Sequence, residues 1–521
     1  MRLPMSKTGS SGDGSSSRPR KLLLLGCTGA LFAAAAPSPA AEVLVTNAST
    51  HVWGQPLIAV NPKNPNNIVM AIMGIAFTKE CRDKAAKDPK SPCADMEVIP
   101  MGNVKTRPIG MITNVPGFTM ATAWASFDGG KTWARTAEVK EGGNVPVLPT
   151  KQYVGPILSD RHGVTAAPDG SFYIAWDATR FANVPYYSDF GGIPYSKSTD
   201  GGRTWSEPAM TGSTLDGGRL VTDLATGTIY TSSSGTPGPN PLSLGDPKVL
   251  ITKDPPTGMD RHIVFTRNSG VTWSKPIIIG GGNESLGAAH GLLATAFKTT
   301  GEQDYLNVGR SNANNNLCGN APKPCTIFQV AKNGGAWTRS VMSIPISYGG
   351  QPAVVANPTK PGHFALMVSE KSGTELHVYR TQDSGKTWSK PTIVTDAPGK
   401  VPTGTWIEYG PTGVLGIAWK SRNAPPPGQA GGQGGGQGGQ NRSPYNVMAA
   451  ISMDGGATFS RPLKINGAES PPPPPDAGFS LSRDGGAYIA LTSDNAYVAW
   501  SDWKTGEGKV MFNAVKIGDF R

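Results

Sequence analysis

The stretch Ser126-Phe-Asp128-Gly-Gly130-Lys-Thr132-Trp133 decides the fold, because it recurs along the chain. In this pattern the Asp can accept hydrogen bonds from the next backbone amides and Gly supplies positive φ, so the loop closes a β-hairpin. The terminal Trp is then placed to pack against a neighbouring unit. Further copies are Ser198–Trp205, Thr266–Trp273, Thr381–Trp388 and Ser452–Phe459, with a worn copy at Val330–Trp337.

The copies start 72, 68, 64, 51 and 71 residues apart, a period that indicates repeated supersecondary units. Gln55–Pro65 recurs as Gln351–Pro361, and we expect both to be innermost strands. Residues 486–516 hold three more strand-like runs, and Val43–Thr46 can supply their missing fourth strand. The sequence therefore predicts an all-β propeller, with seven blades favoured and six as the alternative, whose last blade the N-terminal strand closes.

The composition, with 67 Gly and 46 Pro in 521 residues, agrees with an all-β protein. A propeller grows by adding blades, so we expect residues 42–521 to form a single domain. Two low-complexity segments cannot pack a core. We expect 424–443 to be a flexible insertion in blade six, and 471–475 to be a proline-rich spacer before blade seven.

The first 41 residues have the three parts of a signal peptide: a polar tail with Arg18–Lys21, an apolar run over Leu22–Ala36, and small residues before a cleavage site at Ala40 or Ala41. The run is too short for a spanning helix, so no transmembrane segment is expected after cleavage. We expect a secreted or periplasmic protein. A lipoprotein anchored at Cys27 is the less favoured alternative.

The four cysteines beyond this segment fall into two local pairs, Cys81 with Cys93 and Cys318 with Cys325. Export favours disulfides, each of which would staple a surface loop. No histidine lies near either pair in the sequence, so we expect neither a metal site nor a cofactor.

The net charge is +11 for the whole chain and +7 after residue 41. A diffuse positive charge is compatible with an anionic glycan or a cell envelope as partner. It is equally compatible with a role in solubility alone. The export signal and the absence of a basic cluster beyond the N-terminal tail exclude nucleic acid. We expect a monomer.

The repeated pattern resembles the Asp box, or BNR repeat, of the sialidase superfamily, whose blades carry it between the third and fourth strands. The resemblance implies that the boxes are structural, here through Asp128, Asp200, Asn268, Asp383 and Asp454. It also implies an active centre on the opposite face, built by loops that enter the innermost strand and loops that join the second and third strands.

A sialidase-like glycosidase needs arginines for a carboxylate, a Tyr nucleophile with a Glu base, and an Asp acid. On this resemblance we assign Asp160 as acid, Tyr409 as nucleophile and Glu284 as its base. The carboxylate grip is assigned to Arg161, Arg261 and Arg310. The family's first arginine has no counterpart in Trp53–Leu57, where Gln55 stands in its place.

The sequence leaves three functions open. The first is an exported sialidase-like glycoside hydrolase, an exo-α-sialidase if active, that acts on a glycan such as a sialic acid conjugate. The second is a non-catalytic propeller that binds carbohydrate or protein. The third is a polysaccharide lyase, for which His162, His262 and His290 are the candidate bases.

Overall fold

The structure is a computed structural model in which residues 39–521 form a compact unit of their own. It describes residues 41–46, 51–77, 80, 83–84, 87–88, 120–138, 157–180, 193–206, 209–211, 220–224, 226–234, 261–274, 277–280, 293–297, 303–310, 326–332, 338–342, 353–370, 373–424, 443–473 and 486–520.

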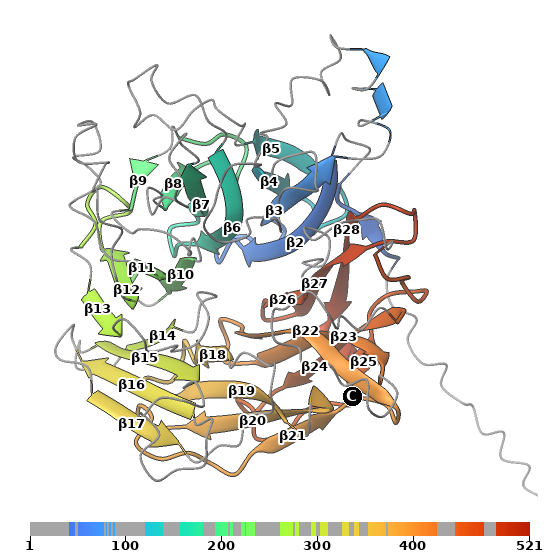
Figure 1. The fold of residues 1–521 in the computed structure, drawn as a ribbon. Helices are drawn as coiled ribbons and strands as arrows, with labels where there is room; N and C mark the ends of the chain where they lie inside the picture. Colours follow the sequence, from blue (N-terminus) through green and yellow to red (C-terminus); the bar gives the residue numbers. More distant parts are fainter. Residues whose placement is uncertain are drawn as a thin grey trace, which may run out of the picture. The chain divides into compact units, whose positions relative to one another are not determined.

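The described strands form seven four-stranded sheets, each antiparallel throughout (Figure 1). The first four, from the first strand outward, are β2 (His51–Val60), β3 (Ile68–Phe77), β4 (Met120–Ser126) and β5 (Ala134–Glu138); β6 (Ile157–Ala166), β7 (Phe172–Arg180), β8 (Pro194–Ser198) and β9 (Ala209–Met210); β10 (Leu220–Asp223), β11 (Thr228–Ser234), β12 (Arg261–Thr266) and β13 (Ile277–Gly280); β14 (Leu293–Phe297), β15 (Gln303–Arg310), β16 (Thr326–Lys332) and β17 (Thr338–Met342).

The remaining three are β18 (Ala353–Ala356), β19 (Phe364–Glu370), β20 (Glu375–Thr381) and β21 (Thr392–Thr395); β22 (Lys400–Tyr409), β23 (Leu415–Asn423), β24 (Tyr445–Ser452) and β25 (Leu463–Lys464); β26 (Ala487–Leu491), β27 (Asn495–Asp502), β28 (Lys509–Lys516) and β1 (Val43–Leu44). A 3-10 helix, η6 (Ile517–Asp519), follows β28. The predicted β-propeller is confirmed, and we call each sheet a blade, numbered one to seven in this order.

The first strand of each blade lies next to the central axis (Figure 1). A cavity on this axis is lined by residues of β2, β6, β10, β18, β22 and β26. Neighbouring first strands contact one another around the ring, as β22 does with β26, and β2 with both β26 and β6. The recurring sequence at Gln55 and Gln351 does mark first strands, since β2 spans His51–Val60 and β18 begins at Ala353.

The core lies between blades rather than at the axis. Nearly all second-strand residues whose burial is described are buried, and the tryptophans Trp176, Trp419 and Trp500 are 0% exposed. Trp500 belongs to a cluster that joins blades six and seven, and Trp176 to one that joins blades one and two. Because apolar side chains pack between neighbouring blades, closing the stack of blades into a ring leaves no apolar face exposed.

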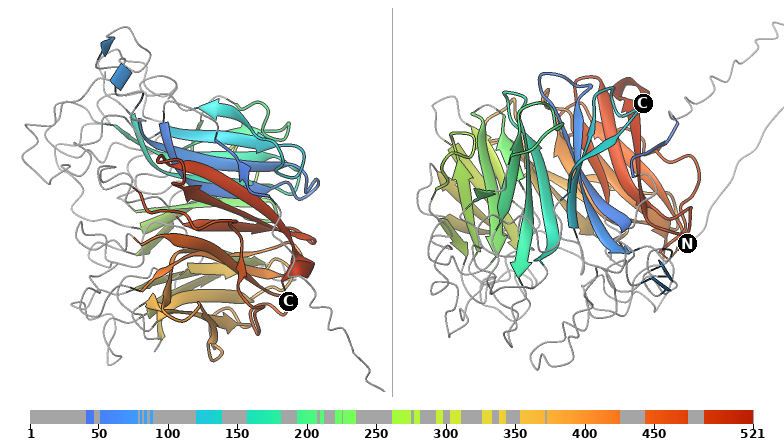
Figure 2. Two further views of the ribbon diagram at one scale, coloured as in Figure 1. Left: turned by 90° about the vertical axis from the view of Figure 1, so that its right-hand side faces the viewer. Right: turned by 90° about the horizontal axis from the view of Figure 1, so that it is seen from above.

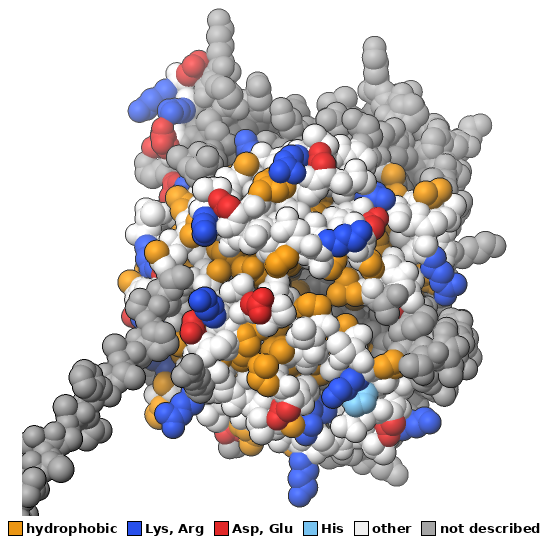
Figure 3. Space-filling model, turned by 180° about the vertical axis from the view of Figure 1, so that it is seen from behind, with side chains coloured by type: hydrophobic (Ala, Val, Ile, Leu, Met, Phe, Trp, Pro, Cys, Tyr) orange, Lys and Arg blue, Asp and Glu red, His pale blue; other side chains and the backbone are white. Residues whose placement is uncertain are grey.

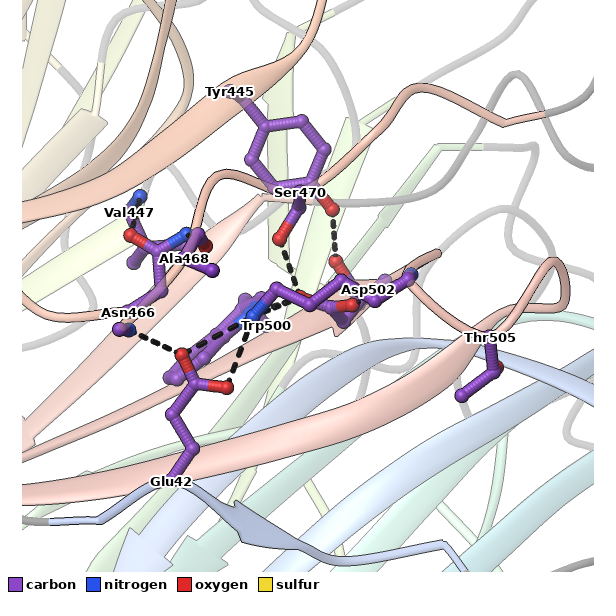
Figure 4. Close-up of polar contacts among 12 residues, drawn as sticks. Glu42, Tyr445, Val447, Asn466, Ala468, Ser470, Trp500, Asp502 and Thr505 are labelled. Carbon is purple, nitrogen blue, oxygen red and sulfur yellow. Dashed lines mark hydrogen bonds and ion pairs between the residues drawn. The ribbon is translucent and has the colours of Figure 1, made fainter.

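The N-terminal strand completes the seventh blade, as predicted. Val43 pairs with Phe512 and Leu44 with Met511, and the Val45 amide donates a 2.9 Å hydrogen bond to the Val510 carbonyl. Glu42 adds a polar clasp: its carboxylate accepts hydrogen bonds from the Gly467 amide and from Lys504 Nζ, the latter at 3.0 Å (Figure 4). The clasp therefore ties the N-terminal strand to both of the last two blades.

A second polar layer joins the same two blades. Asp502, 4% exposed, accepts hydrogen bonds from the Ser470 hydroxyl and from Trp500 Nε1, and the Tyr445 hydroxyl donates to the Ser501 carbonyl (Figure 4). Buried polar groups of this kind must be satisfied, so they fix the position of one blade against the next.

Candidate functional site

The blades have two unlike ends. The hairpins that join first to second strands lie beside the Asp-box loops at one end, which we call the box end: the Gly129 amide donates a 2.9 Å hydrogen bond to the Asn66 carbonyl. Figure 2 shows hairpins gathered at one end of the sheets. The first strands begin at the other end, which we call the entry end, and there the second strands stop.

Each Asp box is held by its own acidic or amide side chain. Asp128 accepts hydrogen bonds from the Lys131 amide at 3.0 Å, the Thr132 amide at 2.9 Å and the Thr132 hydroxyl at 2.6 Å. The Ser126 hydroxyl donates to Asp128 at 2.8 Å and accepts from the Gly130 amide at 2.8 Å. The boxes at Asp200, Asn268, Asp383 and Asp454 repeat this network.

The hydrogen bonds in these loops change the pKa values of the Asp-box carboxylates. Burial acts to raise the pKa of Asp128, but the hydrogen bonds from Thr132, Ser126 and Lys131 outweigh it and lower the pKa to about 2. The same balance lowers the pKa of Asp200 to about 2. A carboxylate that accepts several hydrogen bonds is a poor proton donor at neutral pH, so these groups suit a folding role and not acid catalysis.

The boxes also set each blade against the one before it. The second glycine of a box sits against the preceding blade so closely that a Cβ on Gly270 would lie 2.6 Å from the Tyr195 hydroxyl oxygen. That hydroxyl donates a 2.6 Å hydrogen bond to the Gly270 carbonyl. Trp273, at the end of the box, packs on the Tyr195 ring with centroids 5.4 Å apart. The predicted packing on a neighbouring unit is therefore present.

The axis opens at the box end into a cavity of about 390 Å³. Its walls are mainly apolar residues of the first strands, and its described acidic residues are Asp223 and Glu408, with no Lys or Arg in the described lining. Figure 3 shows this face, with hydrophobic side chains gathered around its middle and Lys and Arg mainly farther out.

Tyr409 lies at this end and not at the entry end, which corrects its assignment as nucleophile. It is 9% exposed, and its hydroxyl donates a 3.1 Å hydrogen bond to the carbonyl of Gly455 in the sixth blade's box. Burial raises its pKa to about 12. A phenol that is buried, hydrogen-bonded to a structural loop and hard to ionise supports the fold, not a reaction on the opposite face.

The other predicted residues fall at the entry end where they are described. Asp160 and Arg161 lie inside β6, and Arg261 is the first residue of β12. Arg310 is the last residue of β15. Their backbones thus share the entry end of blades two, three and four.

Several predictions fall outside the described residues. These are Glu284, His290 and the cysteines Cys81, Cys93, Cys318 and Cys325. The catalytic role of Glu284 and the two disulfides therefore stay predictions, as does the signal peptide over residues 1–41.

Three first strands are interrupted near the entry end by β-bulges, which the sequence did not reveal. The antiparallel register shifts between Gly54 and Leu57 in β2, between Ser159 and His162 in β6, and between Thr403 and Trp406 in β22. The bulge of β6 consists of Asp160 and Arg161, and that of β2 contains Gln55. Bulges re-aim side chains and are common beside active sites, so these strands form the candidate site.

Buried cations support the bulge of β22. Arg422, 6% exposed, donates hydrogen bonds from Nε to the Thr403 hydroxyl at 3.2 Å and from Nη1 to the Ser443 carbonyl at 2.5 Å. Its guanidinium carbon and Lys420 Nζ lie 4.5 and 4.6 Å from the centroid of the Tyr445 ring. These contacts connect the bulge at Thr403 with residues of β23 and with Tyr445 of β24.

The described residues contain no group of three His, Cys, Asp or Glu side chains that could hold a metal ion. In the same part of the chain, no helix has the length and apolar character needed to cross a membrane.

Comparison with known proteins gives distant structural similarity alone. No protein-family model and no curated protein sequence matches the chain. A Hadza microbial sialidase is 15% identical, with a TM-score of 0.38, over 78% of this chain and 74% of its own. The sialidase NanB of Streptococcus pneumoniae is 9% identical, with a TM-score of 0.40, over 92% and 94%.

An α-L-arabinanase of Penicillium chrysogenum, solved with arabinobiose, is 14% identical over 74% of this chain and 100% of its own, with a TM-score of 0.38. Similarity at these TM-scores carries no conclusion about activity. The function has to be argued from the residues of this chain.

Proposed function

We propose that the protein acts on a glycan at the entry end of the propeller, as an exported sialidase-like glycoside hydrolase. One observation carries the proposal: Asp160 and Arg161 are adjacent residues in the bulge of a first strand, beside the axis. The neighbouring first strand, β2, is bulged as well. The backbone thus has an acidic and a basic residue next to each other in a bulged first strand, and the neighbouring first strand has a bulge of its own.

The two side chains have complementary chemistry. A carboxylic acid can protonate the oxygen of a leaving sugar, and a guanidinium group pairs bidentately with a carboxylate. We assign Asp160 as the acid and Arg161 as a partner of an anionic group on the sugar. Arg261 and Arg310, from the next two blades, are the further candidates for that grip.

The proposed reaction needs a second group to attack the sugar or to activate water, and Tyr409 does not fill that place. Glu284, which lies outside the described residues, is the candidate, because most glycoside hydrolases use a pair of carboxyl groups where sialidases use a tyrosine nucleophile. A carboxylate at this position would act as nucleophile or as general base.

Turnover of a fluorogenic sialoside across pH 4 to 8 tests the proposal. We expect Asp160→Asn and Arg161→Ala to lower kcat/KM by about 100-fold or more. Asp494→Asn, the same chemical change on an exposed residue of the β26–β27 hairpin at the box end, is the matched control and should keep full activity. A folded wild-type protein that turns over no sialoside or other aryl glycoside would exclude the hydrolase.

A non-catalytic glycan-binding propeller is the second candidate. This function is favoured because Tyr409, the predicted nucleophile, instead donates a hydrogen bond to the Asp box of blade six. Binding on a glycan array without product would establish this function. Release of an unsaturated uronate, detected by its ultraviolet absorbance, would instead identify the lyase.

A further inference from the structure

Three described residues other than glycine have left-handed backbone conformations: Gln55 at φ 51°, Ser269 at 60° and Ser384 at 60°. Both serines follow the Asn or Asp of an Asp box. At that place the other intact boxes have Gly129, Gly201 and Gly455, with φ between 72° and 78°. The box turn itself therefore accounts for the two serines.

Gln55 has no such explanation. It lies in the bulge of β2, where the bulge of β22 has Gly404 at φ 54°. Both bulges thus contain a residue in the left-handed conformation, which is glycine in blade six and glutamine in blade one. The left-handed region disfavours side chains with a Cβ, and the following Pro56 adds a further restriction on the backbone of residue 55. Glycine would adopt this conformation with less strain than glutamine does.

Gln55 belongs to the candidate site, in the strand beside β6. β2 lies between β26 and β6 around the axis, and β6 carries Asp160 and Arg161 in its own bulge. Gln55 is partly exposed. Strained residues of this kind gather at functional sites, where the strained position serves recognition or catalysis.

We propose that Gln55 is a ligand-recognition residue that binds the hydroxyl or acetamido groups of the glycan. This inference rests on the proposed function. A primary amide is neutral and carries both donors and an acceptor, so it can bind neutral polar groups of one sugar ring in both senses. The charged group of the ligand is left to Arg161. The ligand class is therefore a sugar that presents hydroxyl or N-acyl groups beside an anionic or reacting centre.

The test compares Gln55→Gly with Ser384→Gly, its matched control. Both substitutions put glycine at a left-handed position, one at the candidate site and one in an Asp box. We expect both variants to have a Tm equal to or above that of the wild type. Gln55→Gly should weaken binding of the best array glycan by about tenfold, the effect of one lost polar contact. Ser384→Gly should leave the Kd unchanged.

Gln55→Asn and Gln55→Ala complete the series. Asn keeps the amide and tolerates the left-handed region better than other residues, so it should bind more tightly than Ala. Equal Kd values for Gln55→Gly and wild type would overturn the inference and leave the proposed function standing. A Gln55→Gly variant with a lower Tm would also overturn the inference, provided that Gln55→Asn binds the glycan no more tightly than Gln55→Ala. A folded wild type that binds no glycan would overturn both.

Discussion

Trp133 of the first Asp box meets Phe512 of the last blade edge-on, with ring centroids 5.3 Å apart and an interplanar angle of 67°. Gly130 of the same box approaches the same ring so closely that a Cβ there would lie 2.1 Å from a Phe512 carbon. The contact joins residues almost 400 positions apart in sequence. The first Asp box therefore helps to close the ring of blades, in addition to forming a hairpin turn.

Replacing Trp133 should weaken the contact between the first and the last blade. We expect Trp133→Ala to lower the free energy of unfolding by about 3 kcal/mol, because it removes a large, partly buried aromatic side chain and leaves Phe512 uncovered. Trp133→Phe, which keeps an aromatic ring, should cost less than half of this. Urea unfolding followed by tryptophan fluorescence measures both, and equal losses for the two variants would contradict the packing account.

The hydrogen bond from Tyr409 to Gly455 predicts a purely structural phenotype. Tyr409→Phe should lower the free energy of unfolding by about 1 kcal/mol, since the Gly455 carbonyl loses its partner. Turnover and glycan affinity of the folded variant should equal those of the wild type. Loss of turnover by 100-fold or more with unchanged stability would restore Tyr409 as the nucleophile.

The Asp boxes predict how stability depends on pH. Asp128 and Asp200 have folded pKa values of about 2, below the ordinary aspartate value of 3.8. Their stabilising contribution is thus complete above pH 3.8 and is lost as pH falls toward 2. Asn268 already fills the same place in the third box, where its Oδ1 accepts from the Thr272 amide at 2.9 Å.

The double variant Asp128→Asn, Asp200→Asn should therefore fold, and its Tm should fall less between pH 4 and pH 2 than that of the wild type. Scanning calorimetry at several pH values gives both curves. A variant whose acid sensitivity equals that of the wild type would show that other groups control unfolding in acid.

The Glu42 clasp predicts coupling between the N-terminal strand and the seventh blade. Glu42→Ala and Lys504→Ala should each lower the free energy of unfolding by about 1 kcal/mol, because the ion pair at 3.0 Å is only partly exposed. The double variant should lose less than the sum of the two. Additive losses would mean that the pair contributes nothing beyond its separate side chains.

The fold could be predicted from the sequence because its signals are local and repeated. The Asp boxes place the hairpin between the third and fourth strands, and the run after Phe459 gives a blade that lacks a fourth strand. Val43 and Leu44 then follow as the closing strand, because the strand-like run Val43–Thr46 was the available partner. Each step depends on short-range pattern and on the need to cover a sheet edge.

The site was less predictable, since it depends on register. Tyr409 looked like a nucleophile by residue type, but it stands at the end of β22 beside a hairpin, which puts it at the box end. The bulges were hidden because Trp53–Leu57 and Pro402–Trp406 share no sequence pattern beyond a glycine, placed differently in each. Only the pairing of Gly54 with Met73 and of Leu57 with Ala71 reveals that Gln55 departs from the ladder.

A crystal structure with a bound glycan fragment tests the central claim most directly. We expect the sugar at the entry end, in contact with Asp160 and Arg161 of β6 and with Gln55 of β2, and no sugar at the box end. A fragment bound in the axial cavity beside Asp223 and Glu408, with the three bulges unoccupied, would contradict the claim.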